Sequence, residues 1–187
     1  MTDSRKFKPP TSGSSKSRGK FHIDYKNPAQ KMAWAAFDLH DVVFLSGPAG
    51  VGKSHLAMAY AIYEVLQKNK SRIVLTRPIV ESGESLGYLP GDFYEKVNPY
   101  MAPMYDCIRR IVGTEGPQRD MINASLEVCP LAYMRGRTFD DAVCIFDEAQ
   151  NASMLQLKMF LTRFSENSKV IVTGDPKQSD IGGSGAF

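Results

Sequence analysis

The stretch GPAGVGKS, residues 47–54, decides the fold of this 187-residue chain. It matches the pattern G-x-x-x-x-G-K-[ST] at every position. The apolar run DVVFLS (41–46) before it predicts a strand buried on both faces, and SHLAMAYAIYEVLQKNK (54–70) after it predicts a helix. A loop between such a strand and helix is the context in which this pattern binds nucleotide phosphates. The alternative is a glycine-rich turn without a ligand.

The residue types of this loop suit phosphate binding. Gly47, Gly50 and Gly52 allow the backbone to curl so that its N–H groups point at phosphate oxygens, and the helix N-terminus adds positive potential. Lys53 is expected to reach the β- and γ-phosphates, and the Ser54 hydroxyl is expected to bind Mg²⁺. The residues predicted to bind the nucleotide here are Gly47, Pro48, Ala49, Gly50, Val51, Gly52, Lys53, Ser54 and His55.

An acidic pair supports this prediction. The run AVCIFDEAQ (142–150) contains a buried strand that ends at Asp147 and Glu148. Because parallel strands end at the same edge of a sheet, both carboxylates are expected beside the loop. Asp147 is the predicted Mg²⁺ partner, and Glu148 is the predicted base that orients and deprotonates an attacking water. The alternative is that both acids only begin the next helix, where they suit the helix dipole.

Strands and helices alternate along the rest of the chain. This alternation predicts an α/β fold with a doubly wound, mostly parallel sheet. The expected elements are helices over 27–38 (with Asn27 as N-cap), 54–70 and 153–164, and strands over 41–46, 72–76, 129–135, 142–147 and 169–175. The apolar stripe expected on the central helix consists of Leu56, Ala59, Tyr63 and Leu66. Gly and Pro residues between 87 and 120 predict loops and short helices there.

The charge of the chain is unevenly distributed. Its net charge is +3, of which residues 1–20 supply +5, so residues 21–187 carry −2. Residues 1–20 are also rich in Ser, Pro and Gly, and they predict a disordered basic tail that is either simply solvated or attracted to nucleic-acid phosphates. Residues 21–187 are expected to form a single domain, because 43% apolar residues are enough for a sizeable core.

The composition favours a cytoplasmic protein. No apolar run approaches the roughly 20 residues that a membrane span needs, and no apolar stretch follows the basic N-terminus. Cys107, Cys129 and Cys144 form no Cys-x-x-Cys pair, which gives little support to a disulfide or zinc framework. Cys144 lies in an apolar run and is predicted to be a small buried side chain.

Several motifs occur in an order that resembles a known family. Gln30 is followed by GPAGVGKS, TRPIVESGE (76–84), DEAQ (147–150) and GDPKQ (174–178), as in the first motor domain of superfamily-one helicases. Longer strings, such as MRGRTFDDAVCIFDEAQN and ENSKVIVTGDPKQSD, resemble the PhoH-like ATPases of bacteria and phages. The resemblance covers residues 27–180. It implies a RecA-like P-loop NTPase fold with a single motor domain over 21–187, which binds ATP and Mg²⁺ and hydrolyses ATP.

The resemblance implies roles for three glutamines. Gln30 matches the glutamine that reads the adenine edge, since its amide offers both a donor and an acceptor. Gln178 matches the glutamine that senses the γ-phosphate and couples it to nucleic acid, and Gln150 is expected to bind the attacking water or the partners of Mg²⁺. The alternative for each is an ordinary polar residue. Asp175 is expected only to stabilise the turn before Gln178 or a nearby water.

A nucleic-acid contact is also implied. Thr76 and Arg77 match residues that touch the backbone of a single strand, so RNA or single-stranded DNA is an expected partner. Several aromatic residues in the next segment are suited to stack on bases, but at this spacing they are more often part of a core. They are Tyr88, Phe93, Tyr94, Tyr100 and Tyr105.

The chain has no room for the second motor domain that supplies arginines to the γ-phosphate in those helicases. We therefore expect a homo-oligomer, such as a hexameric ring, in which a neighbour supplies the arginine. The candidates are Arg135, Arg137 and Arg163, each of which is otherwise an ordinary surface or ion-paired arginine. PhoH-like chains continue beyond Gln178 with a further segment, so a contribution from such a segment stays open.

Two functions are therefore compared. The first is Mg²⁺-dependent ATP hydrolysis coupled to binding or remodelling of RNA or single-stranded DNA. The second is an ATP-dependent oligomeric switch that binds a protein partner, which the negative charge of residues 21–187 keeps open. A small-molecule kinase is disfavoured by DEAQ and GDPKQ.

Overall fold

A computed structural model describes residues 21, 23–79 and 93–180 of the chain. The predicted tail over residues 1–20 lies outside this range, as do most residues of TRPIVESGE. The elements in chain order are α1 (Pro28–Leu39), β1 (Val42–Ser46), α2 (Lys53–Leu66), β2 (Arg72–Thr76), α3 (Phe93–Val112), α4 (Pro117–Ser125), β3 (Leu126–Val128), η2 (Leu131–Tyr133), β4 (Ala142–Phe146), η3 (Ala149–Asn151), α5 (Met154–Leu161) and β5 (Lys169–Gly174).

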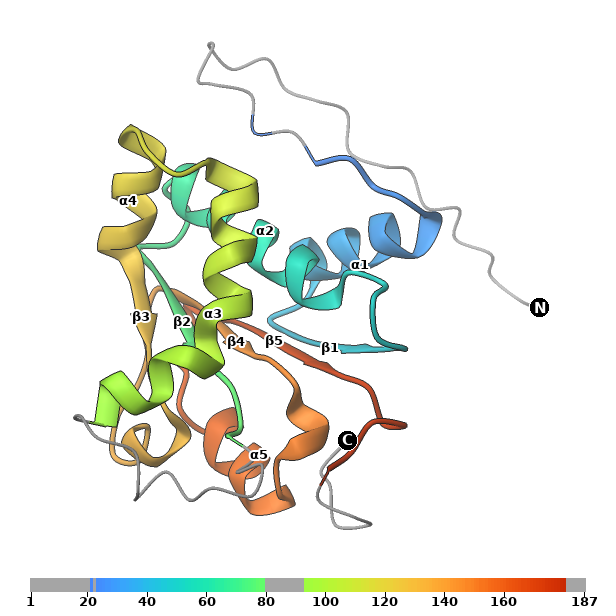
Figure 1. Ribbon diagram of the computed structural model, residues 1–187, viewed down its shortest axis with the longest axis vertical. Coiled ribbons are helices and arrows are strands. Elements are labelled where there is room, and N and C mark those ends of the chain that lie inside the picture. Colours follow the sequence, from blue (N-terminus) through green and yellow to red (C-terminus); the bar gives the residue numbers. More distant parts are fainter. Residues whose placement is uncertain (1–20, 22, 80–92, 181–187) are drawn as a thin grey trace.

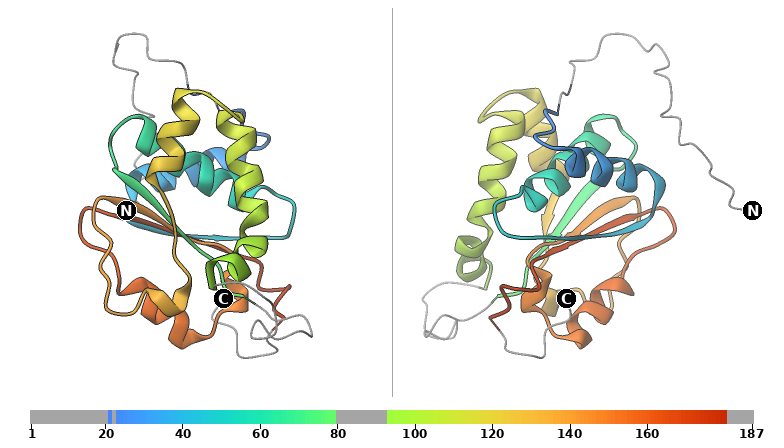
Figure 2. Two further views of the ribbon diagram at one scale, coloured as in Figure 1. Left: turned by 60° about the vertical axis from the view of Figure 1, so that its left-hand side comes forward. Right: turned by 90° about the vertical axis from the view of Figure 1, so that its right-hand side faces the viewer.

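The five strands form one sheet in the order β1-β5-β4-β2-β3, and all four pairings are parallel. Helices lie on both faces of this sheet (Figures 1 and 2). The predicted α/β class and the doubly wound, mostly parallel sheet are therefore confirmed. Because every strand runs the same way, the ends of β1, β2, β4 and β5 lie at a common carboxyl edge, where the sequence places its motifs.

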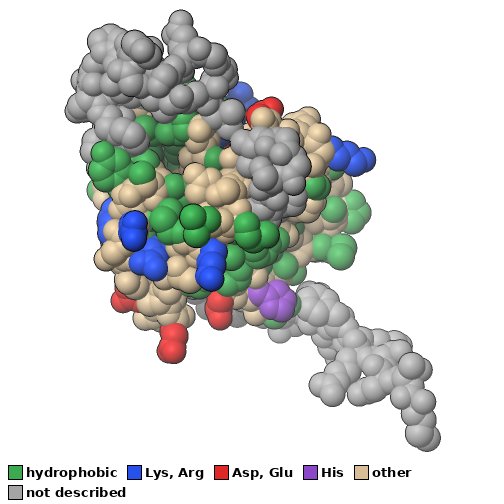
Figure 3. Space-filling model, turned by 90° about the horizontal axis from the view of Figure 1, so that it is seen from below, with side chains coloured by type: hydrophobic (Ala, Val, Ile, Leu, Met, Phe, Trp, Pro, Cys, Tyr) green, Lys and Arg blue, Asp and Glu red, His purple; other side chains and the backbone are tan. Residues whose placement is uncertain are grey.

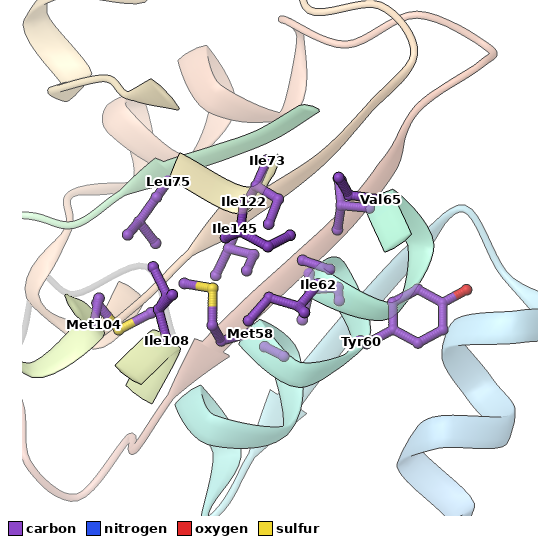
Figure 4. Close-up of a cluster of buried hydrophobic side chains, with 14 of the residues drawn as sticks. Met58, Tyr60, Ile62, Val65, Ile73, Leu75, Met104, Ile108, Ile122 and Ile145 are labelled. Atoms are coloured by element: carbon purple, nitrogen blue, oxygen red, sulfur yellow. The ribbon is translucent and has the colours of Figure 1, made fainter. Parts of the chain in front are cut away.

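The core has one apolar cluster on each face of the sheet. On one face, side chains from α2, α3 and α4 meet the sheet; Ile62 of α2 and Ile108 of α3 belong to the same cluster as Ile145 of β4 (Figure 4). On the other face, Phe146 of β4 packs against Phe160 of α5, with ring centroids 4.9 Å apart. Cys144 points into this second cluster and is 1% exposed, as predicted.

Helix α2 is buried on more sides than the predicted stripe implies. Residues 56–62 are all buried, because α1 covers one flank of the helix and α3 and α4 cover the other (Figure 1). A helix that follows the phosphate loop and is enclosed in this way is held firmly against the sheet. Its first turn therefore provides a rigid support for Lys53 and Ser54.

The prediction that β1 is buried on both faces is wrong. β1 is an edge strand, and Val42 and Phe44 are 38% and 47% exposed. They pair with Val170 and Val172, which belong to the cluster on the α5 face, so Val42 and Phe44 point toward that same face. An apolar run of four residues does not distinguish a central strand from an edge strand.

The segment between residues 87 and 120 is also more regular than predicted. It contains the 20-residue helix α3, which includes Pro99 and Pro103, and the start of α4. Val97, Met101, Met104 and Ile108 recur every three or four residues and are buried, mainly against α2. This packing outweighs the helix-breaking tendency of the two prolines.

The strand predicted over residues 129–135 is absent from that position. Residues 131–133 form a short 3₁₀-helix preceded by Pro130, and the strand β3 lies earlier, at Leu126–Val128. Proline lacks the N–H that a strand ladder requires, which explains why the strand ends before Pro130. None of the helices in the described ranges is long and apolar enough to span a membrane.

Candidate active site

The phosphate loop joins β1 to α2, and two of its predicted glycines have positive φ angles. Gly50 and Gly52 have φ angles of 77° and 90°, which L-residues with side chains rarely adopt. Lys53 folds back over the loop, and its Nζ donates to the carbonyl oxygens of Gly47 (2.7 Å) and Pro48 (2.9 Å). The ammonium group thus lies over the concave side of the loop, where a nucleotide phosphate would exchange with these carbonyls.

The acidic strand reaches the loop although β5 lies between β1 and β4. Ser54 Oγ donates to Asp147 Oδ1 at 2.6 Å, and Thr173 Oγ1 of β5 donates to the same oxygen at 2.6 Å. Asp147 is 2% exposed. The structure therefore brings together the two residues predicted to bind Mg²⁺ and adds Thr173, which the sequence analysis missed. Its position next to GDPKQ was the available signal.

Glu148 follows directly and has a left-handed backbone, with φ 55° and ψ 42°. Its Oε2 accepts a hydrogen bond from Gln150 Nε2 at 2.5 Å, and its Oε1 lies 3.8 Å from an Arg77 nitrogen. Arg77 also lies 4.0 Å from Asp147 Oδ2. The carboxylate predicted to act as a base is thus fixed by an amide on one side and a guanidinium on the other.

The turn after β5 lies against the phosphate loop. Gln178 N–H donates to the Asp175 carbonyl at 3.0 Å, which closes the predicted turn, and the Asp175 carboxylate accepts from Ala49 N–H at 3.1 Å. Gln178 itself is exposed. The contact between Asp175 and the loop was not predicted, because the sequence gives no sign that this carboxylate turns back toward Ala49.

A cavity of about 390 Å³ lies between the start of α1 and the phosphate loop. Gln30 forms part of its wall: Nε2 donates to the Val51 carbonyl at 2.9 Å, and Oε1 accepts from Lys26 N–H at 2.8 Å. Each end of the amide thus makes one bond to backbone, which leaves one N–H and one oxygen lone pair for an adenine edge. Much of the remaining lining is apolar and suits a nucleobase: Pro28, Ala29, Ala33, Leu45 and Leu56.

His55 lines a second cavity, of about 500 Å³, between the phosphate loop and α3. The pKa of its imidazole is lowered, first by partial burial and then by the positive charges of Arg110 and Lys26. A neutral imidazole is thus favoured at this position. The structure therefore places His55 beside the loop, facing α3 across this cavity.

Of the two residues predicted to touch nucleic acid, one is buried and the other, Arg77, has a side chain that is 25% exposed. Thr76 is 1% exposed, and its hydroxyl has no hydrogen-bond partner in the described part of the chain. Arg77 faces the acidic pair and donates to the Tyr100 carbonyl at 3.5 Å. Tyr105 packs against the core, while Tyr88 and the side chains of Phe93 and Tyr94 lie outside what the structure describes.

The three candidate arginines differ in their surroundings. Arg137 forms an ion pair with Glu127 at 2.5 Å and lies 4.7 Å from the centre of the Phe139 ring. Arg163 donates to Thr162 Oγ1 at 3.1 Å. Arg135 is exposed in the loop after η2. Of the three, Arg135 is the one with no ion pair or side-chain hydrogen bond among the residues that the structure describes.

Comparison with known proteins agrees with this site. The family model described as PhoH-like protein matches residues 22–186. The chain belongs to the PhoH-like family. A PhoH-like protein of Bacillus subtilis is 49% identical over 159 residues, which is 85% of this chain and 50% of the relative. A PhoH-like protein of Mycobacterium tuberculosis is 49% identical over 166 residues (89% and 47%), and Protein PhoH of Escherichia coli K12 is 45% identical over 159 (83% and 45%).

The chain thus spans about half the length of the curated relatives that it matches. Membership of the PhoH-like family agrees with the phosphate loop and the parallel sheet, and it identifies a nucleotide-binding protein with a P-loop fold. The names of these relatives state no reaction.

Proposed function

We propose that this domain hydrolyses ATP in a Mg²⁺-dependent reaction that is coupled to RNA or single-stranded DNA. The contact between Ser54 Oγ and Asp147 Oδ1, 2.6 Å long, carries the proposal. It brings the phosphate loop and the acidic strand together at one edge of the sheet, with Glu148 next in the chain. A nucleoside kinase transfers phosphate to a bound hydroxyl and does not need this adjacent glutamate.

The donor set near Ser54 fits Mg²⁺. The Ser54 hydroxyl, the Asp147 carboxylate and the Thr173 hydroxyl meet within hydrogen-bond distance, and oxygen ligands of this kind are what Mg²⁺ prefers. Ser54 and Asp147 would hold the ion, directly or through water, with Thr173 orienting the carboxylate. When bound, the ion would neutralise charge on the phosphate oxygens.

The side chains of this chain supply the other parts of the reaction. Lys53 exchanges its carbonyl partners for the β- and γ-phosphates, and the cavity beside Gln30 takes the base. Glu148 accepts the proton of the attacking water as its oxygen approaches the γ-phosphorus, and the bond to the leaving ADP oxygen breaks. Gln178, exposed in the turn beside the loop, senses the γ-phosphate.

Coupling to nucleic acid is supported by the position of Arg77. It follows β2 immediately and lies within 4.0 Å of both acids of the site, so a movement of the chain after β2 is transmitted to them. The test is the ATPase rate with and without single-stranded RNA or DNA at two salt concentrations. We expect stimulation that falls steeply with salt, because phosphate contacts release counterions. Absence of both stimulation and binding would contradict the coupling.

A protein-binding switch is the second candidate, and the α5 face of the molecule favours it. Met154 and Leu155, in the first turn of α5, are 63% and 77% exposed. Hydrophobic side chains gather on this face beside Lys and Arg (Figure 3). Residues 21–187 carry a net charge of −2, which is not typical of a dedicated nucleic-acid binder. Nucleotide-dependent binding of a protein without stimulation by RNA or DNA would favour this candidate.

We further propose that the active form is a homo-oligomer. Lys53 is the cation of the phosphate loop, and the nearby Arg77 is engaged with Asp147 and Glu148. An arginine from a neighbouring copy would complete the charge around the γ-phosphate, and Arg135, which is exposed and makes no ion pair within the described residues, is the candidate. A monomer with full ATPase activity, measured by light scattering and turnover, would contradict this proposal.

A further inference from the structure

Three consecutive hydrogen bonds join the phosphate loop to Glu148. Ala49 N–H in the loop donates to Asp175 Oδ2 at 3.1 Å. Asp175 N–H donates to Gln150 Oε1 at 3.0 Å, and Gln150 Nε2 donates to Glu148 Oε2 at 2.5 Å. The connection therefore passes from the loop to the residue after β5, then to Gln150 in η3, and ends at the second residue after β4.

The two middle members of this connection are buried. Asp175 is 5% exposed and Gln150 is 2% exposed. The Gln150 carbonyl is held as well, by Ser179 Oγ at 3.0 Å, so the backbone around Gln150 is tied to the turn after β5. Gln150 Oε1 and Nε2 each make one of these bonds, so the side chain is fixed between Asp175 and Glu148. A buried hydrogen-bonded network of this kind is rigid, so its members are linked mechanically.

Asp175 places a negative charge at an anion-binding loop. Its carboxylate accepts from Ala49 N–H, and its other oxygen accepts from Lys177 N–H at 3.0 Å. Backbone N–H groups of such loops are the donors that bind nucleotide phosphates. Two negative charges a few ångströms apart in a partly buried site repel each other strongly. A bound nucleotide and the present position of Asp175 therefore oppose each other.

We propose that Asp175 is a positioning residue that couples occupancy of the phosphate loop to the placement of Glu148, with Gln150 as the connecting side chain. This inference rests on the proposed ATPase function. Asp175 holds Ala49, and Gln150 together with Arg77 holds Glu148. Phosphates in the loop push the carboxylate away from Ala49. The Asp175 backbone then shifts Gln150, and Glu148 moves with it into position to accept a proton from water.

The decisive variant is Asp175→Asn, which removes the charge and keeps the shape. We expect MgADP and pyrophosphate to bind about tenfold more tightly, because the carboxylate no longer competes at the loop. We expect kcat for ATP to fall at least about tenfold, because occupancy no longer moves Glu148. Tighter nucleotide binding together with a lower kcat distinguishes this role from general damage to the loop, which would weaken binding and lower kcat. Isothermal calorimetry and steady-state kinetics measure the two effects.

Asp180→Asn is the matched control. Asp180 is five residues further along and exposed, and its carboxylate accepts from Asn151 Nδ2 at 3.0 Å. It removes the same charge near the site, so we expect affinity and kcat within about twofold of the original chain. Equal tightening of nucleotide binding in both variants would mean that only the overall charge matters, and the inference would be wrong.

A second variant, Gln150→Met, tests the connection separately. Methionine fills a similar volume but makes neither hydrogen bond, so kcat falls while the affinity for MgADP stays within about twofold. The double variant, Gln150→Met with Asp175→Asn, should lose no more turnover than either single variant. Both substitutions interrupt the same connection between the phosphate loop and Glu148. Additive losses in kcat, or an Asp175→Asn variant that binds nucleotide more weakly, would overturn the inference.

The binding measurements separate this inference from the proposed function. If the original chain binds MgADP but hydrolyses no ATP under any condition, the proposed function is wrong, whereas the pyrophosphate comparison still decides whether Asp175 competes at the loop. If ATP hydrolysis is normal and Asp175→Asn changes neither affinity nor kcat, the proposed function stands and the inference is wrong.

Discussion

At the scale of single residues, Glu148 combines an unfavourable backbone with close side-chain partners. A left-handed conformation costs a residue with a side chain roughly 1–2 kcal/mol, yet Glu148 has φ 55° and ψ 42°. Its carboxylate is held by Gln150 and faces Arg77. Strained residues persist where the surrounding structure fixes them, commonly at functional sites. The position of Glu148 is therefore maintained by contacts that also control its chemistry.

Replacing Glu148 with Gln tests its role as the base. The amide has nearly the same shape and can still accept from Gln150, but it cannot take a proton from water. We expect ATP affinity within about threefold of the original chain and a kcat lower by about 10²–10⁴-fold. Glu166→Gln is the control, because Glu166 is an exposed acid before β5, at the opposite end of the strands. Normal turnover by Glu148→Gln would show that another group accepts the proton.

Cys144 gives the stability of the fold a dependence on alkaline pH. Burial raises the pKa of its thiol from 9.0 to about 12. Between these values the unfolded chain releases this proton and the folded chain keeps it. The stabilisation is therefore complete below pH 9 and is lost as the pH rises through 12.

We expect the free energy of unfolding to fall with pH more steeply in the original chain than in Cys144→Ala. The difference in slope is at most about 1.4 kcal/mol per pH unit, which corresponds to one proton. Urea titrations at pH 8, 9.5 and 10.5 measure it. Burial also raises the pKa values of Cys129 and Tyr60, so only the difference between the two chains reports on Cys144. Equal slopes in the two chains would show that the Cys144 thiol does not have the raised pKa in the folded chain.

At the scale of elements, α1 depends on a cap that also serves the site. The Asn27 side chain accepts from Gln30 N–H at 2.9 Å, and Pro28 occupies the first helical turn. Asn27→Ala should lower the stability of the chain by about 1 kcal/mol, read as a lower midpoint of thermal unfolding. Asn27→Ser retains a capping oxygen and should stay close to the original. If Asn27→Ala and Asn27→Ser have the same midpoint of thermal unfolding, the capping oxygen does not stabilise the chain.

The elements show why some features follow from sequence and others do not. The strand before the phosphate loop, the cap at Asn27 and the acidic end of β4 depend on local patterns, and each was predicted within one or two residues. Helix α3 was not predicted, because Pro99 and Pro103 argue against a helix locally and only packing against α2 outweighs them. The contact of Asp175 with Ala49 joins residues 126 positions apart, so no local pattern reveals it.

At the scale of the whole molecule, the described residues leave the β1 edge of the sheet and the outer side of α5 open. β1 forms the edge next to the phosphate loop, with Val42 38% exposed, and α5 presents Met154 and Leu155 to solvent. Exposed apolar surface of this kind is typical of sites where further chain or another molecule packs. The open surface therefore accords with an assembly of several copies, in which an exposed arginine of one copy reaches the phosphate loop of the next.

Mixing of two inactive variants tests this assembly. Arg135→Ala should keep nucleotide affinity and lose about 10³-fold or more in kcat, because a trans arginine contributes about 10³–10⁵-fold. Glu148→Gln is inactive for a different reason and keeps Arg135. In mixed oligomers a subunit with Glu148 receives Arg135 from a Glu148→Gln neighbour, so the mixture should recover activity that neither variant shows alone. Arg163→Ala is the control: if Arg135 is the acting residue, it should be close to fully active. Activity of the mixture equal to the sum of its parts would show that Arg135 does not act across subunits.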